Sequence, residues 1–323
     1  MTDQIFAYIT HKNGVADDTA VELAVAAGKI NADAAVTAIV AGSGDQLEAV
    51  CTQMATSYAA VWKLDDEAFA YPNADVIRLA LASLLPEKAI VLVPHDTFGM
   101  DLSPGLSVKL NAAFIADIVG VEGFGDNKLT VVRQEYGGQV STHVSADMAS
   151  GAVINVRPGI FQSEESAAVS GEIIDKSGDV GEVTTNRKFL EVVEAEVGDV
   201  DITKSEVLVS VGRGIEDEDN LEIAFDLAKA MGADVSCSRP IVDAKWMEKS
   251  RQVGTSGQTV KPKVYLAAGI SGSFQHLGGL KGNPFIVAIN KNLKAPIFQV
   301  ADVGIEADIL DFLPELTEGI EAL

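Results

Sequence analysis

This 323-residue sequence is poor in the residues that build reactive and metal-binding sites. It has two cysteines, Cys51 and Cys237, which lie far apart and have no CxxC companion, and its four histidines lack the spacing of metal ligands. We therefore predict no disulfide framework and no metal site, and we expect both cysteines to be buried or inert in a reducing compartment. The sequence also has no GxSxG elbow, so it does not indicate an α/β-hydrolase.

Positive charge is scarce as well. The chain has 24 Lys and Arg residues against 47 Asp and Glu residues, which gives a formal charge of -23. Binding to nucleic acid or to an anionic membrane needs a basic surface, so neither partner is expected. Three explanations of the acidic excess remain open: attraction of basic partners, solubility, and a salt-adapted source.

Long hydrophobic runs are missing too. The longest apolar stretches, such as residues 89–94, are far too short to cross a bilayer, and the first ten residues (MTDQIFAYIT) have no basic segment followed by an apolar one. We therefore expect a soluble, cytoplasmic protein of prokaryotic type that does not insert into a membrane.

What the sequence does contain predicts two α/β domains, residues 1–194 and 195–323. In the first domain, short apolar strands alternate with helical patterns, which favours a doubly wound, mostly parallel sheet. The expected strands are 5–10, 34–41, 59–64 and 89–93, and the expected helices are 16–30, 46–55 and 73–85 with Asn73 as the cap.

Four further strand-like segments are expected to complete this sheet. They are 114–121, 129–135, 138–144 and 152–156, with a turn at Gly137-Gly138 between the second and the third. Residues 163–203 are acidic and polar, so we interpret them as an excursion and a linker.

The second domain repeats a strand, a glycine-rich turn and a helix. The expected strand 206–210 leads into Gly212-Arg213-Gly214 and then into a helix at 220–231. This order is typical of nucleotide sites, but any parallel α/β turn also uses glycine, and the full GxGxxG pattern is absent. Arg213 favours the nucleotide interpretation, because a cation at the carboxyl end of a strand suits a pyrophosphate.

Polar residues follow the later strands of this domain. Further strands are expected at 233–237, 264–268, 286–289 and 296–300. The polar segments after them include Ser238-Arg239-Pro240, the turn GISGSFQH that ends at His276 and is expected to enter a helix, and Asn290. A lone histidine usually has a structural role, but His276 lies near a helix start that suits an anion. Polar side chains at the carboxyl ends of parallel strands predict a ligand at that edge of the sheet.

The motifs SRP, GTSG, GISGSFQH and VAINKNLKAPIFQVAD together resemble the electron-transfer flavoprotein alpha subunit family. The similarity is strongest over residues 206–316, and RQEYGGQV and INVRPGIF extend it into the first domain. The resemblance implies a Rossmann-like (DHS-like) C-terminal domain that binds FAD and an N-terminal domain that packs on a beta subunit. It also implies an electron carrier rather than an enzyme, fed by dehydrogenases such as the acyl-CoA dehydrogenases of fatty acid oxidation and emptied by an acceptor oxidoreductase.

The resemblance also implies roles for individual residues. Arg239 would lie against the isoalloxazine ring, Ser256 would bond flavin N5, and His276 would lie near N1 and O2 as a positive partner. Asn290 and Asp308 match positions on the adenosine side. The full set expected at the cofactor is Arg213, Ser238, Arg239, Val253, Gly254, Thr255, Ser256, Ser271, Gly272, Ser273, Phe274, Gln275, His276, Asn290, Asp308 and Ile309.

The sequence departs from the family at three positions near this set. Thr255 stands where the family usually has Gln, Val303 where it has an aromatic residue, and Lys245 where Gly is common. Two other functions stay open: half of an NADH-dependent, electron-bifurcating complex with a second FAD in the beta subunit, and a nucleotide-binding regulator without a redox role.

Overall fold

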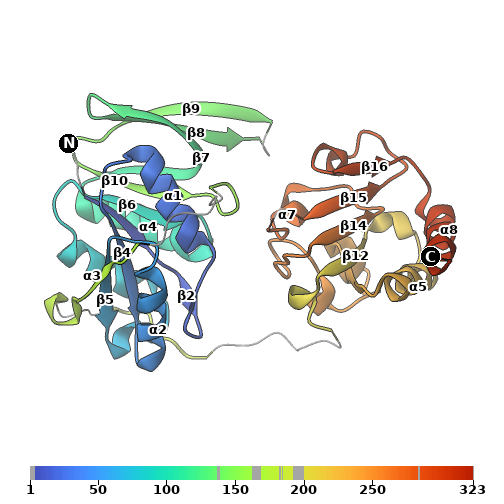
Figure 1. Ribbon diagram of the computed structural model, residues 1–323, viewed down its shortest axis with the longest axis horizontal. Helices are drawn as coiled ribbons and strands as arrows, with labels where there is room; N and C mark the ends of the chain where they lie inside the picture. Colours follow the sequence, from blue (N-terminus) through green and yellow to red (C-terminus); the bar gives the residue numbers. More distant parts are fainter. Residues whose placement is uncertain are drawn as a thin grey trace. The chain divides into compact units, whose positions relative to one another are not determined.

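The computed structural model describes residues 4–136, 139–161, 169–181, 183, 185–191, 200–282 and 284–322. It divides into two compact units, residues 1–191 and 192–323, each built around its own sheet (Figure 1). The boundary expected at residue 194 and the turn expected at Gly137-Gly138 lie outside the described residues.

The N-terminal unit contains a nine-stranded sheet and a two-stranded ribbon. The strands of the sheet are β1 (Ile5–Tyr8), β4 (Val36–Gly42), β5 (Ala60–Asp65), β6 (Ile90–Pro94), β7 (Ala113–Gly125), β8 (Lys128–Glu135), β9 (Val140–Asp147), β10 (Ala152–Val156) and β11 (Glu172–Asp175); the ribbon is β2 (His11–Lys12) with β3 (Val15–Ala16). Their order is β11-β5-β4-β1-β6-β10-β7-β8-β9, and only the β7–β8 and β8–β9 pairs are antiparallel within the sheet. This confirms the doubly wound, mostly parallel sheet.

Helices cover both faces of this sheet. The helices α1 (Thr19–Ile30) and α2 (Asp45–Met54) share one apolar core with the sheet, and α3 (Ala74–Leu84) and α4 (Thr97–Leu110) share the other. Asn73 caps α3 as predicted, because its side chain accepts a hydrogen bond from the Asp75 N–H.

The sequence analysis assigns no element to residues 97–110, which form α4. Pro104 and two glycines weaken the helical pattern there. Gly99 is needed because a Cβ at this position would lie 1.9 Å from the Pro94 carbonyl oxygen, and a Cβ at Gly105 would lie 2.4 Å from Arg78 Nε. The same glycines that weaken the helical pattern in the sequence therefore allow α4 to pack closely against Pro94 and Arg78.

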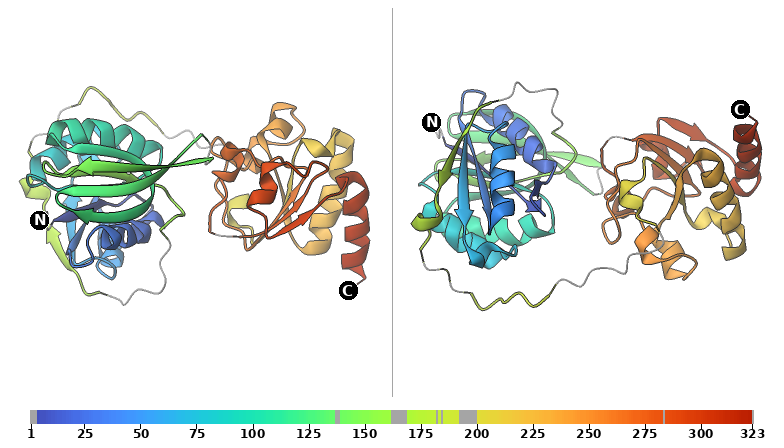
Figure 2. Two further views of the ribbon diagram at one scale, coloured as in Figure 1. Left: turned by 90° about the horizontal axis from the view of Figure 1, so that it is seen from above. Right: turned by 60° about the horizontal axis from the view of Figure 1, so that its bottom comes forward.

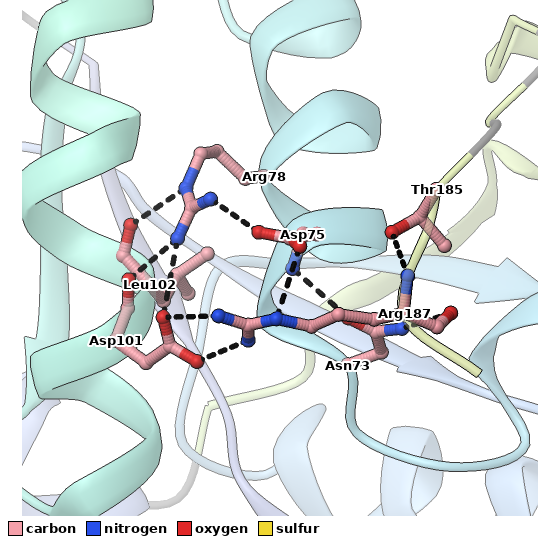
Figure 3. A network of polar contacts seen from close by, with 7 residues as sticks. All are labelled: Asn73, Asp75, Arg78, Asp101, Leu102, Thr185 and Arg187. Carbon is pink, nitrogen blue, oxygen red and sulfur yellow. Dashed lines mark hydrogen bonds and ion pairs between the residues drawn. The ribbon is translucent and has the colours of Figure 1, made fainter. Parts of the chain in front are cut away.

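Two parts of the segment expected to be an excursion and linker are tied to the rest of the N-terminal unit. Strand β11 pairs in parallel with β5 and forms an edge of the sheet. Further along, the Arg187 guanidinium lies between the carboxylates of Asp75 and Asp101, at 3.1 Å and 2.5 Å, and Arg78 bonds the same two aspartates (Figure 3). The sequence analysis keeps residues 163–194 in the first domain but assigns no strand to them, so it misses β11 and the Arg187 network.

The C-terminal unit is a five-stranded, fully parallel sheet. Its strands are β12 (Val207–Val211), β13 (Asp234–Cys237), β14 (Val264–Ala268), β15 (Phe285–Ile289) and β16 (Val303–Ile305), in the order β13-β12-β14-β15-β16. The helices α5 (Leu221–Met231) and α8 (Ile309–Glu321) lie side by side on one face (Figure 2). The other face is covered by loops, by α7 (Phe274–Leu277) and by a 3₁₀ turn at Pro296–Gln299. The strand order changes direction between β12 and β14, because β13 is added on one side of β12 and β14 on the other. Open α/β sheets bind ligands at such a switch point.

Two local predictions in this unit are corrected. The strand expected at 296–300 is the 3₁₀ turn, because Pro296 lacks an N–H for a sheet ladder and suits the first turn of a helix. The helix expected after GISGS is the four-residue α7. Pro240 lies in the first turn of α6 (Arg239–Asp243), where proline is favoured, and Arg239 is exposed.

Both cysteines are free and buried, as predicted. Burial raises the pKa of the Cys51 thiol to about 11 and that of Cys237 to about 12, so neither is a thiolate at neutral pH. Within the described ranges, no helix is long and apolar enough to cross a membrane, and no group of His, Cys, Asp and Glu forms a metal site.

The Arg187 network generates a prediction about the segment it holds. Arg187→Ala should speed chymotrypsin cleavage at Phe189-Leu190 about two- to fivefold. Residues 186–191 are exposed, so loss of the network should make this peptide bond more accessible, and the effect stays small because exposed ion pairs contribute little to stability. Stacking of Phe189 on Tyr71, with ring centroids 4.2 Å apart, should remain. Lys188→Ala, which removes the neighbouring exposed cation, is the control. Equal cleavage of Arg187→Ala and wild type would show that the network does not hold this segment.

Candidate functional site

A cavity of about 440 Å³ lies at the carboxyl edge of the five-stranded sheet. The turns that follow β12, β13, β14 and β15 all contribute to it, which is the edge that the sequence predicts. It is lined by Arg213, Ser238, Arg239, Pro240, Asp243, Gln252, Val253, Gly254, Thr255, Ser256, Gly269, Ile270, Ser271, Ser273, Gln275, His276 and Asn290.

Three glycines allow two of these turns to touch. A Cβ on Gly212 would lie 2.4 Å from the Gly269 carbonyl oxygen, and a Cβ on Gly214 would lie 2.7 Å from Gly269 Cα. Gly269 also has a φ of +65°, which favours glycine. The turns after β12 and β14 therefore pack backbone against backbone. This close contact explains why glycine stands on both sides of Arg213, a pattern that the sequence alone could not distinguish from an ordinary turn.

The loop with the GTSG motif is tied to its surroundings by backbone hydrogen bonds. The Val253 N–H donates to the Cys237 carbonyl at 2.9 Å, and the Thr255 N–H donates to the Gln275 carbonyl at 2.8 Å. Gln252 Nε2 donates to Ser256 Oγ at 2.9 Å, which orients that hydroxyl. The sequence analysis missed Gln252, whose position two residues before the motif was the available signal.

Backbone N–H groups collect at the start of α7. Within the described part of the chain, none of the five N–H groups of residues 271–275 donates a hydrogen bond. Backbone amides in folded proteins are nearly always paired with protein or water, so an unpaired run beside a cavity can bind an anion. Because α7 is a single turn, its dipole adds little, and the amides themselves provide this property.

Two cations stand at the same edge. Arg213 and Arg239 line the cavity and are exposed, and Arg239 Nε lies 3.3 Å from a carboxylate oxygen of Asp243. Arg213 makes no ion pair and no side-chain hydrogen bond among the described residues. A planar guanidinium without a partner beside unpaired amides suits a phosphorylated ligand.

His276 is the titratable residue most altered by this environment. Its side chain is 5% exposed, and burial lowers the pKa of the ring to about 4, with a smaller opposite effect from the Val253 backbone. Its Nε2 lies 2.7 Å from the Tyr265 hydroxyl, whereas its Nδ1 is buried without a hydrogen-bond partner among the described residues. The ring is therefore neutral at pH 7 and differs from the positive partner that the resemblance implies.

The structure brings twelve of the sixteen expected cofactor residues to the cavity lining. Gly272 turns with a φ of +79° against Ile297, Phe274 is exposed, and Ile309 is buried in the core. Asp308 caps α8 and pairs with Lys291 at 2.8 Å. These four do not line the cavity, while five lining residues were not expected: Pro240, Asp243, Gln252, Gly269 and Ile270.

Comparison with known proteins gives the family of this chain. An electron transfer flavoprotein domain matches residues 5–179, and an electron transfer flavoprotein FAD-binding domain matches residues 201–281. The chain belongs to the electron transfer flavoprotein alpha subunit family. The second match contains most of the cavity lining, so the unit with the cavity is the FAD-binding domain of the family.

Similar proteins come from distant organisms. The chain is 38% identical to the electron transfer flavoprotein subunit alpha of Methylophilus methylotrophus over 252 residues, which cover 77% of each chain. It is 31% identical to the same subunit of Thermoanaerobacterium thermosaccharolyticum over 324 residues, covering 99% of this chain and 98% of the relative. Protein FixB of Clostridium saccharobutylicum is 32% identical over 255 residues, covering 78% of this chain and 76% of the relative.

The cavity fits FAD in its chemistry. The unpaired amides of residues 271–275 and the Arg213 guanidinium suit a pyrophosphate. The unpartnered His276 Nδ1 and the oriented Ser256 hydroxyl offer polar contacts to a ring. The assignment of individual residues to parts of FAD remains a prediction.

Lys245 departs from the family at a position where the backbone favours glycine. It is exposed and has a φ of +63°, which is unfavourable for a residue with a Cβ. We predict that Lys245→Gly raises the free energy of unfolding of this unit by about 0.5–1 kcal/mol, measured by urea denaturation. Lys229→Gly, in the last turn of α5, should lower it by about 1 kcal/mol. A lower free energy of unfolding in Lys245→Gly would contradict the claim that the backbone at Lys245 is strained.

His276 should make stability depend on pH. Its pKa is about 4 in the folded chain against 6.5 for an unperturbed histidine, so between these values only the unfolded chain takes up the proton. As pH falls from 6.5 to 4, the wild type should therefore lose about 3 kcal/mol more unfolding free energy than His276→Asn. His143→Asn, on exposed β9, is the control and should follow the wild type. Parallel pH profiles of His276→Asn and wild type would contradict the buried neutral ring.

Proposed function

We propose that this chain is the alpha subunit of a heterodimeric electron transfer flavoprotein, that it holds FAD in the cavity of its C-terminal unit, and that it carries electrons from dehydrogenases to an acceptor oxidoreductase. The observation that supports this most is the run of five unpaired N–H groups at residues 271–275 beside Arg213, inside the unit that matches the FAD-binding domain. The names of the relatives support the beta subunit as the partner, since they are called alpha subunits.

Each group at the cavity has a proposed task. The amides of residues 271–275 and Arg213 bind the pyrophosphate, and Arg239 stands beside the ring. The Ser256 hydroxyl, oriented by Gln252, donates to a ring nitrogen. When bound, FAD supplies a centre that accepts and releases electrons, and the protein supplies binding, orientation and electrostatics.

The first test is to co-purify the full-length chain with its beta subunit, count flavins and titrate the complex with NADH without oxygen. One FAD per dimer, not reduced by NADH, is expected for a carrier that receives its electrons from other dehydrogenases. Two FADs with ready reduction by NADH would instead identify an electron-bifurcating complex. A complex without flavin would contradict the proposal and favour a nucleotide-binding regulator.

Substitutions of the cavity cations test whether the flavin binds in this cavity. Arg213→Ala and Arg239→Ala remove the two cations of the cavity and should lower the flavin content or the affinity for added FAD about tenfold, as expected for the loss of a charge-assisted contact. Lys245→Ala removes a nearby exposed cation that does not line the cavity, and it should bind FAD like the wild type. If all three variants bind FAD equally, the flavin lies elsewhere.

A further inference from the structure

Behind the cavity, a tyrosine buried in the sheet touches the cavity histidine. Tyr265 lies on β14 with no exposed surface, and its hydroxyl is 2.7 Å from Nε2 of His276, which is 5% exposed. The two rings are tilted by 48° with centroids 6.1 Å apart. This hydrogen bond is the side-chain contact that fixes one nitrogen of the imidazole.

The direction of the hydrogen bond follows from the protonation of both groups. Burial raises the pKa of the Tyr265 hydroxyl far above its usual range, so the group keeps its hydrogen at all working pH values. The His276 ring is neutral at pH 7 and thus has one donor and one acceptor nitrogen. If Nε2 accepts from Tyr265, the ring proton is on Nδ1.

The surroundings favour this arrangement over the reverse. Ser210 on β12 and Ser236 on β13 lie on the same side of the sheet as Tyr265 and are near enough to lower its pKa. Neither hydroxyl makes a hydrogen bond of full geometry within the described part of the chain. The Tyr265 hydrogen therefore has its best acceptor in Nε2.

We propose that Tyr265 is a positioning residue, which donates to His276 Nε2 and so keeps the imidazole proton on Nδ1 as an uncharged N–H donor to the ligand of the cavity. The inference rests on the proposed function for the identity of that ligand as FAD. The charged groups lining the cavity, Arg213, Arg239 and Asp243, are exposed, whereas His276 offers a buried polar contact without adding a charge. A hydrogen-bond acceptor, such as a ring carbonyl, is the ligand group that fits Nδ1–H.

Nitrogen NMR of the full-length chain, labelled with ¹⁵N on histidine, tests this directly. The chain has four histidines, and His276→Asn assigns the resonance. At pH 7 without added flavin, His276 should be the Nδ1–H tautomer. In Tyr265→Phe the ratio of tautomers should move toward Nε2–H by roughly five- to tenfold, the effect of losing one hydrogen bond.

The control is Tyr58→Phe, which removes the hydroxyl of a buried tyrosine that donates to the Ala20 carbonyl in the N-terminal unit. It should leave the His276 signal unchanged. An Nε2–H tautomer in the wild type would overturn the proposal, and this measurement stands even if Tyr265→Phe does not fold. An unchanged ratio in folded Tyr265→Phe would overturn it too.

Repeating the spectrum after FAD is added separates this inference from the proposed function. A shift of the Nδ1–H signal on addition of FAD is expected from both. Nδ1–H without any response to FAD, in a complex that also carries no flavin, would overturn the proposed function and leave the role of Tyr265 intact. Bound FAD beside an Nε2–H tautomer would overturn the role of Tyr265 alone.

Discussion

The close backbone contact between the turns after β12 and β14 is the constraint on which the C-terminal unit depends. Gly212, Gly214 and Gly269 leave no room for a Cβ, so the two turns meet at the point where the chain reverses across the sheet. That contact places Arg213 and the segment 271–276 at one edge. Within the described residues, the amides of residues 271–275 stay unpaired because the chain leaves β14 in a turn and forms only one helical turn before Gly278. Backbone packing thus positions the groups that can bind a ligand at this edge, and side chains such as Arg213 add to them.

The N-terminal unit shows what happens to a similar set of amides when a side chain fills it. There, the Glu22 carboxylate accepts hydrogen bonds from the N–H groups of Gly159, Ile160 and Phe161, after the carboxyl end of β10. These amides are therefore already paired within the chain. In the C-terminal unit, the amides of residues 271–275 have no such partner among the described residues, and they lie beside the cavity.

The fold could be predicted from the sequence where short apolar strands alternate with helical patterns. The edge of the sheet that carries the cavity could be predicted because polar residues follow the strands there. The sequence analysis placed β12, β14 and β15 and named twelve of the residues that line the cavity. It failed where glycine and proline serve packing: α4 contains Gly99 and Gly105 for close approach, and Pro296 opens a 3₁₀ turn in a segment that looks like a strand. It could not find the Arg187 network or the Tyr265–His276 bond, because both join residues whose proximity depends on the folded chain.

The proposed function depends on FAD occupying the carboxyl edge of the C-terminal sheet. Hydrogen–deuterium exchange of the full-length chain with its beta subunit, with and without FAD, tests it most directly. Bound FAD should slow exchange of the amides at residues 271–275 and in the loop at 253–256, and leave the Glu22-bound amides of residues 159–161 unchanged. Protection confined to the N-terminal unit, or exchange at 271–275 that bound FAD does not alter, would contradict the account.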